Sequence, residues 1–224
     1  MVGGEEVEVT SRERLLANVR GALGRTVGQS PSPAAPLAAP YLRFSESQRN
    51  RSIELFVQNF EKLAGKASIV KNASGVASKV SELLDGRRAV ASNAPYLESC
   101  GVTALAQVQS GIRDRETLRE ACATAGAGIT SVDYALAETG TFVLLSSPQE
   151  ARLISLLPPV HVAVFQQSRI IANLAELLAL VPHPAEQTSA MVLITGPSRT
   201  ADIEQILVRG VHGPGEVYAI IVEE

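Results

Sequence analysis

Apolar residues fall into short β-branched runs and helical repeats that alternate along residues 45–224. Apolar residues that recur every three or four positions predict amphipathic helices. Short unbroken apolar runs between them predict buried strands. The strands are expected at 67–70, 88–91, 141–145, 161–165, 191–194 and 217–222, and the helices at 53–63, 75–84, 114–123, 130–138, 148–157, 168–181 and 200–210. This alternation predicts an α/β fold, a layered and mostly parallel sheet with helices on both faces.

The first forty residues follow a different pattern. Residues 11–23 have apolar positions at helical spacing, and Gly24 ends that helix. Residues 31–40 then hold four prolines, which exclude helix and sheet and favour an extended linker. We therefore expect an N-terminal helix and proline-rich linker at 1–40, followed by a single domain at 45–224. The tether allows the helix to dock on a partner or to pack on its own chain, and both remain open.

The composition excludes several classes of protein. With 46% apolar and 19% charged residues, the chain resembles an ordinary soluble globular protein. A net charge of −3 without a basic run argues against nucleic-acid binding. No apolar run approaches the ~18–20 residues of a membrane span, and the acidic N-terminus lacks the layout of a signal peptide. A cytoplasmic location is the expectation.

Cysteine and histidine patterns give no metal site. Cys100 and Cys122 are the only cysteines and form no Cys-x-x-Cys motif, so this chain alone cannot hold an iron–sulfur cluster or structural zinc in the usual way. His161, His183 and His212 are far apart and lack metal-ligand spacing. His161 and His183 are interpreted as structural or solvated. We expect no metal and no cofactor in this chain.

The stretch at 190–214 holds the main candidate site. After the apolar run at 191–194, Gly196 and Pro197 break the strand, and the helix predicted at 200–210 follows. Backbone amides at a helix N-terminus, together with the Arg199 guanidinium, favour an anion there. Ser198, Thr200 and Asp202 also fit simple helix capping, and that interpretation remains open.

A second polar segment, Glu138 to Thr141, lies between the helix predicted at 130–138 and the strand at 141–145. Glu138 is the candidate catalytic residue, since a partly buried carboxylate there can act as acid, base or nucleophile. The same carboxylate also fits hydrogen bonding to neighbouring amides, and we favour a binding loop over catalysis. Because α/β sheets bind ligands at strand ends, we expect this loop and the Gly196–Asp202 loop to share one pocket.

His212 is a candidate proton carrier or anion ligand, or a turn histidine that packs on the preceding helix end. A helix of about ten residues would place His212 ~15 Å away from Arg199. Arg199 is therefore preferred as the ligand anchor. Arg152 is a further candidate for contact with a carboxylate, although an exposed ion pair is the commoner role. The candidate ligand-binding residues are Thr139, Gly140, Thr141, Gly196, Pro197, Ser198, Arg199, Thr200, Asp202 and His212.

Two motifs carry a resemblance to a known family. Residues 194–204, Ile-Thr-Gly-Pro-Ser-Arg-Thr-Ala-Asp-Ile-Glu, are followed by Gly-Val-His-Gly-Pro at 210–214, and Ala-Glu-Thr-Gly-Thr stands at 137–141. Together they resemble the LUD-domain family of lactate-utilisation proteins. That resemblance implies the fold shared by CoA transferases and ribose-5-phosphate isomerase. The covalent role of a glutamate in CoA transferases is not transferred to Glu138, because the rest of that pattern is not visible.

The resemblance also implies a function: a subunit of a multi-protein system that oxidises L-lactate to pyruvate. Iron–sulfur clusters are then expected in partner subunits, and the polar loops of this chain would bind a small anion or a partner. One alternative is a stand-alone enzyme of the sugar-phosphate isomerase or CoA-transferase type, with Glu138 as acid–base group. The other is a non-catalytic scaffold subunit, in which both motifs only hold loops.

The proline-rich linker generates a first prediction. Limited proteolysis should cut between Gly28 and Pro40 and leave a folded core, because an extended, exposed segment is the preferred site of nicking. Mass spectrometry locates the cut, and circular dichroism of the trimmed product checks its fold. Unfolding of the core on removal of residues 1–40 would contradict the predicted division.

Overall fold

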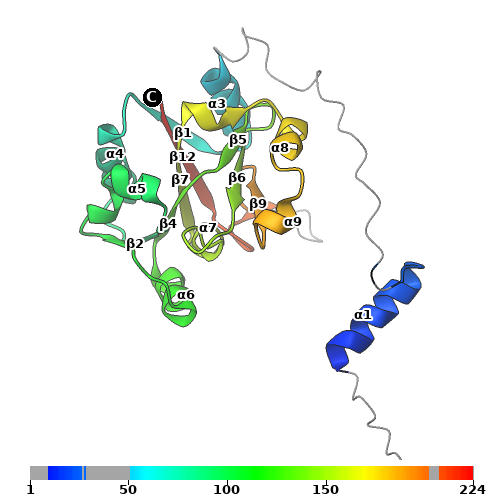
Figure 1. The fold of residues 1–224 in the computed structure, drawn as a ribbon. Helices are drawn as coiled ribbons and strands as arrows, with labels where there is room; N and C mark the ends of the chain where they lie inside the picture. The colour runs from blue at the N-terminus through cyan, green and yellow to red at the C-terminus, as the bar shows by residue number, and fades with distance from the viewer. Residues whose placement is uncertain (1–9, 27, 29–50, 202–206, 224) are drawn as a thin grey trace, which may run out of the picture. The chain divides into compact units, whose positions relative to one another are not determined.

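The computed structural model describes residues 10–26, 28, 51–201 and 207–223 (Figure 1). The main sheet has six parallel strands in the order β1-β12-β7-β4-β2-β3. The C-terminal strand β12 therefore lies inside the sheet, between the edge strand β1 and β7. The strands are β1 (Lys66–Val70), β2 (Ala89–Ala91), β3 (Val108–Gln109), β4 (Ala127–Ser131), β7 (Val160–Gln166) and β12 (Glu216–Val222).

A second sheet of four strands has the order β8-β5-β6-β9. Strand β6 pairs antiparallel with both β5 and β9, whereas β5 and β8 are parallel. A separate antiparallel hairpin is formed by β10 and β11. These strands are β5 (Tyr134–Leu136), β6 (Thr141–Leu145), β8 (Ile170–Ile171), β9 (Met191–Ile194), β10 (Arg199–Ala201) and β11 (Leu207–Arg209).

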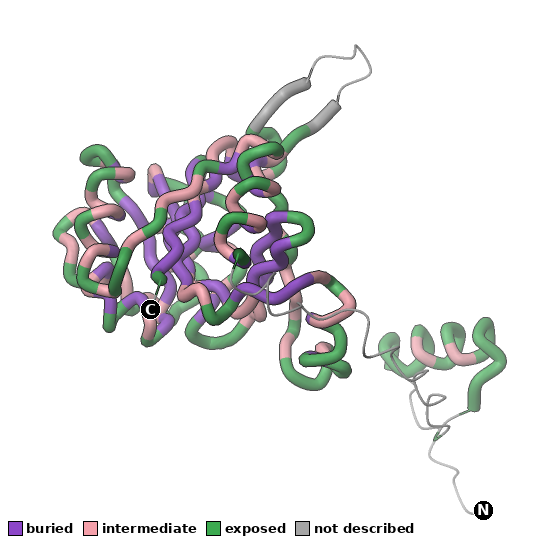
Figure 2. The backbone as a smooth tube through the Cα atoms, turned by 90° about the horizontal axis from the view of Figure 1, so that it is seen from above, coloured by how far each residue is buried: buried purple, intermediate pink, exposed green. Residues whose placement is uncertain are grey.

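Helices surround the two sheets (Figure 1), and Figure 2 shows that buried residues concentrate in the interior of the domain. None of the helices within the described ranges is long and apolar enough to cross a membrane. The α-helices of this region are α3 (Ser52–Lys62), α4 (Ser74–Leu84), α5 (Pro95–Ser99), α6 (Arg115–Thr124), α7 (Leu153–Leu156), α8 (Leu174–Leu180) and α9 (Pro184–Gln187), with 3₁₀ turns η2 (Val102–Ala104) and η3 (Gln167–Arg169).

The core is layered. On one face of the main sheet, Val76, Val80 and Leu84 of α4 pack with strand residues such as Ile129 and Ile220. Four of the five phenylalanines, from α3, β6 and β7, form a second cluster where the two sheets face each other. A third cluster lies under α8, on the outer face of the second sheet. The predicted α/β fold with a layered parallel sheet is confirmed, and the second sheet is an addition to it.

Three predicted helices are wrong in whole or in part. Residues 130–138 hold the end of β4 and then β5, because hydrogen bonds to β6 replace helical ones and Asp133 accepts from Leu145 N at 2.7 Å. The segment at 168–181 adds β8 to β5 first, and its helix begins at Leu174, where Asn173 accepts from Glu176 N. In 148–157 the helix is only the four residues of α7.

The helix predicted at 200–210 is also wrong. Arg199–Ala201 pairs antiparallel with Leu207–Arg209, with Thr200 opposite Val208. The apolar residues of this segment are spaced as in a helix, but several of them are β-branched and therefore also suit a strand pair. Gly210 then turns the chain with a φ of 80°. Asp202 lies outside the described residues. Strand β9 is half-buried, with an antiparallel neighbour, instead of buried on both faces.

The N-terminal helix α1 (Ser11–Ala22) forms a unit by itself. Thr10 and Glu13 make a capping box: the Thr10 hydroxyl accepts from Glu13 N, and Glu13 accepts from Thr10 N at 2.8 Å. None of its residues is buried, and Leu15, Val19 and Leu23 are exposed. The predicted helix is present, and the proline-rich linker after it lies outside the described residues.

Gly128 generates a prediction about stability. A Cβ atom at this position of β4 would lie 1.9 Å from the carbonyl oxygen of Ile154, in the backbone of α7. Gly128→Ala should destabilise the domain by about 1–3 kcal/mol, because overpacking forces the backbone to shift. Gly75→Ala is the matched control: it lies in α4, its Cβ would meet ordinary contacts at 3.6 Å, and alanine favours helix. Urea unfolding measures both, and equal stabilities would contradict the argument.

Candidate functional site

The two sequence motifs lie side by side. Thr141 begins β6 and Thr195 follows β9, and these strands pair with Phe142 opposite Ile194. The Thr141 hydroxyl lies 3.0 Å from that of Thr195 and 2.7 Å from that of Thr139. The antiparallel pairing therefore brings the loop after Glu138 next to the loop at Gly196.

The C-terminal end of α3 packs against both loops. A Cβ atom on Gly140, which has a φ of 62°, would lie 2.3 Å from Phe60 N. At Gly196 it would lie 3.0 Å from the carbonyl oxygen of Leu63, and Arg199 Nη2 donates a hydrogen bond to that same oxygen. Both glycines thus permit a close backbone approach that a side chain would prevent.

The turn at 210–214 joins the same surface. Ser198 N donates to the Pro214 carbonyl at 2.8 Å, and Gly210 N donates to the Ser198 carbonyl at 3.1 Å. The expectation that His212 lies at the far end of a helix is therefore wrong, because a hairpin returns the chain to its starting point. His212 is exposed, whereas Pro197 and Pro214 are buried.

The expected helix N-terminus is replaced by strand β10, so a helix dipole does not support the predicted anion contact at Arg199. Arg199 is exposed, and its guanidinium contacts a carbonyl oxygen, so its charge is not neutralised by that contact. Glu138 is exposed as well, and its backbone N–H donates to Ala172 O. Exposure leaves Glu138 without the burial that acid–base chemistry usually needs, so its catalytic role stays a prediction. The backbone of Thr200 belongs to β10.

Sequence reasoning missed Glu150, the one buried acidic residue among those described. Its Oε2 accepts hydrogen bonds from Ser92 Oγ at 2.9 Å, Ser131 Oγ at 3.0 Å and Ser131 N at 3.3 Å. Ser92 follows β2 and Ser131 ends β4, which are neighbours in the parallel sheet. Glu150 thus lies at the carboxyl ends of two parallel strands, where ligands of α/β proteins usually bind.

Burial raises the pKa of Glu150 to about 7. Hydrogen bonds from Ser92 and Ser131 oppose this shift, and the charge of Asp133 adds to it. Its Oε1 is buried and has no hydrogen-bond partner among the described residues. A polar residue after each strand is a sequence signal for Ser92 and Ser131, but no local pattern places Glu150 beside them.

Burial excludes a solvated role for His161. It lies in β7, fully buried, with Nε2 2.8 Å from Thr130 Oγ1. Burial lowers its pKa to about 3, so the ring is neutral at physiological pH. Within the described ranges, no group of three or more His, Cys, Asp or Glu side chains is arranged to hold a metal ion.

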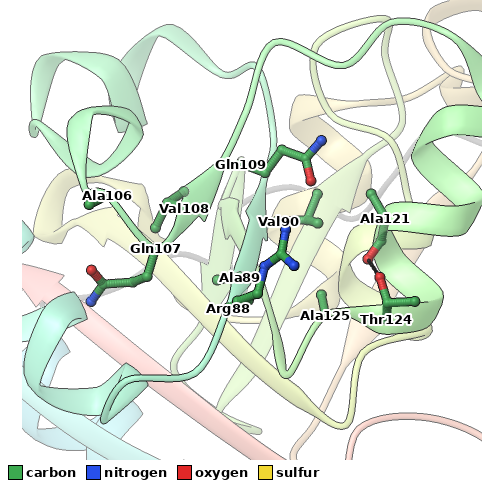
Figure 3. A pocket seen from close by; sticks show the side chains of 10 residues that line it. All are labelled: Arg88, Ala89, Val90, Ala106, Gln107, Val108, Gln109, Ala121, Thr124 and Ala125. Carbon is green, nitrogen blue, oxygen red and sulfur yellow. Dashed lines mark hydrogen bonds between the residues drawn. The ribbon is translucent and has the colours of Figure 1, made fainter.

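A cavity of about 500 Å³ lies beside β2 and β3, against the end of α6. Figure 3 shows Arg88 extending into the space between Gln109 and Ala121. Thr124 also lines it, but its hydroxyl donates to the carbonyl oxygens of Ala121 and Glu120. None of the predicted site residues lines this cavity.

Comparison with known proteins assigns the family. The model of the LUD domain matches residues 53–222. The chain belongs to the LUD-domain family. The matched range of this LUD-domain protein contains both sheets and both sequence motifs, and it excludes α1 and the linker.

The relatives of this LUD-domain protein share its length. Lactate utilization protein C of Halalkalibacterium halodurans is 31% identical, over 96% of this chain and 99% of that protein. Lactate utilization protein C of an Exiguobacterium species is 29% identical, over 96% and 97%. A crystal structure of a DUF162 family protein from Deinococcus radiodurans has a TM-score of 0.60 at 19% identity, covering 78% of this chain and 98% of that one. This structure supports the fold alone.

Glu150 generates a pH prediction. Its pKa of about 7 in the folded protein exceeds the ordinary 4.5, because burial favours the protonated carboxyl. The stabilisation of the folded state that results is complete below pH 4.5 and is lost as the pH rises through 7. Glu150→Gln keeps the shape without the charge. The free energy of unfolding of the variant should therefore rise relative to wild type between pH 5 and 8, by up to roughly 3 kcal/mol.

Urea unfolding across this pH range measures the difference. The opposing titration of buried His161 is present in both proteins and cancels in the comparison. Glu138→Gln, which removes an exposed carboxylate, is the control. A difference between Glu150→Gln and wild type that does not change with pH would contradict the buried-carboxyl argument.

Proposed function

We propose that this protein takes part in lactate utilisation, as a component of a multi-protein system that oxidises L-lactate to pyruvate. The supporting observation is similarity along nearly the whole chain to proteins named lactate utilization protein C. The similarity covers 96% of this chain and therefore extends beyond the LUD domain at 53–222.

The electron carriers of this system belong to iron–sulfur partner subunits in this proposal. Cys100 and Cys122 are both buried, and they form no disulfide with each other. Burial raises the pKa of the Cys122 thiol to about 11, which disfavours the thiolate that binds metal or exchanges disulfides. Two cysteines cannot supply the four thiolates of a usual cluster.

The contribution of this chain is to hold a small carboxylate or a partner on the surface formed by the two motifs. On the loop that follows Thr195, the Arg199 guanidinium is exposed and contacts the Leu63 carbonyl oxygen. A guanidinium matches the fork of a carboxylate such as that of lactate.

A cytoplasmic location is part of the same proposal.

A second candidate is a stand-alone small-molecule enzyme, and the observation that favours it is Glu150. A carboxyl with a pKa of about 7 at the ends of β2 and β4 suits general acid–base catalysis near neutral pH. In this proposal Glu150 replaces exposed Glu138 as the acid–base group. Turnover of a phosphosugar or acyl-CoA by the purified chain, lost in Glu150→Gln, would support it over the first candidate.

Arg199→Ala tests the first proposal. In a strain whose own copy of the gene is deleted, the variant should restore growth on L-lactate poorly, because a charge-assisted contact of about 1.5–3 kcal/mol is lost. That energy corresponds to about ten- to a hundredfold in affinity. Folding should be preserved, since the side chain is exposed.

Arg51→Ala is the matched control: it removes an exposed arginine whose ion pair, within the described part of the chain, is with Glu54 three residues on, at 2.8 Å. Thermal unfolding of both variants checks their stability. Normal growth on L-lactate with Arg199→Ala would contradict anion binding at this surface and would favour the scaffold alternative.

A further inference from the structure

A larger cavity, of about 1030 Å³, lies apart from the two motifs. Its walls come from α6, from the segment Ser146–Leu153 that leads into α7, and from Ala185–Ser189 at α9. The labels of Figure 1 show α7 between α6 and α9. Neither the Arg199 surface nor Glu138 contributes to this cavity.

Three arginines line the cavity, against the single carboxylate of Glu186. Arg115 and Arg119 are one helical turn apart on α6, and Arg152 precedes α7. Arg119 Nε pairs with Glu116 at 3.0 Å. Arg115 and Arg152 are exposed and have no ion pair among the described residues. One guanidinium from α6 and one from the residue before α7 therefore line the same cavity.

Ser146 and Thr188 belong to another part of the lining. Thr188 Oγ1 donates to the Ser146 carbonyl at 2.8 Å, and Ser146 N donates to Ala190 O at 2.9 Å, so this part is tied together. The Ser146 hydroxyl itself is buried and has no hydrogen-bond partner among the described residues. Such a donor costs free energy unless a ligand or water accepts from it.

The size and lining of the cavity indicate the kind of ligand. Small-molecule sites typically have volumes of roughly 300–1000 Å³, so this cavity is large enough for a nucleotide and much larger than lactate needs. Leu118, Ala151 and Leu153 supply apolar surface for an organic moiety. Arginines recognise phosphate and carboxylate in a bidentate way, and a diphosphate concentrates enough charge to engage two guanidiniums at once.

We propose that this cavity binds a nucleotide-sized organic diphosphate, with Arg115 and Arg152 contacting the phosphate groups. The apolar wall at Leu118 and Leu153 holds the organic part. The site is independent of the proposed carboxylate contact at Arg199, because the two share no residue. A ligand bound in this cavity would make the protein respond to a second metabolite. That response would be separate from the contact with lactate or a partner protein that is proposed at Arg199.

Isothermal titration of the full-length chain with ADP tests the proposal, with inorganic pyrophosphate and L-lactate as comparison ligands. Wild type should bind ADP, and Arg115→Ala/Arg152→Ala should weaken that binding by roughly a hundredfold, about tenfold for each lost guanidinium contact. Pyrophosphate should bind more weakly than ADP because it lacks the part that contacts Leu118 and Leu153. Binding should also weaken as salt is raised.

Arg113→Ala is the matched control, because Arg113 is exposed and close in sequence but lines a different cavity, with Asn93 and Ser110. It should bind ADP as wild type does. Thermal unfolding checks each variant, and Arg152→Ala alone serves if the double variant does not fold. No ADP binding at millimolar concentration would overturn the proposal. So would equal weakening by Arg113→Ala, equal affinity for pyrophosphate, or displacement of ADP by L-lactate.

Discussion

The contact between the two sheets through aromatic rings is the interaction on which the rest of the domain depends. Phe56 and Phe60 of α3, Phe142 of β6 and Phe165 of β7 have ring centroids 4.9–5.8 Å apart. Aromatic pairs of this kind contribute about 0.5–1.5 kcal/mol each beyond their buried area. In an otherwise aliphatic core they fix the second sheet and α3 against the parallel sheet.

The candidate binding surface follows from that packing. Because α3 is held by its phenylalanines, its last turn presents the Phe60 amide and the Leu63 carbonyl to the two loops. Gly140 and Gly196 allow the loops to approach this turn, and Asn59 donates to the Ala137 carbonyl at 2.8 Å. The position of Arg199 thus depends on the end of a helix, at Leu63, that is 136 residues away in the sequence.

Glu150 occupies a different place in the same architecture. Parallel strands end together, so Ser92 and Ser131 meet at one edge of the sheet and bond to a single carboxylate. Such a group is costly to bury when charged, and that cost raises its pKa. The domain therefore holds three chemically different regions: an exposed arginine between two loops, a buried carboxyl at strand ends, and an arginine-lined cavity between helices.

Local pattern was enough to predict the elements whose neighbours in space agree with their propensities. The strands β1, β6, β7 and β12 and the helices α4 and α6 were predicted close to their observed positions, as were the parallel sheet and the breaks at Gly140 and Gly196. Only tertiary structure decided the hairpin at Arg199–Arg209, the strand at 134–136 and the partners of Glu150. In each of these cases, hydrogen bonds to residues distant in sequence outweigh a periodicity that fits helix or loop equally well.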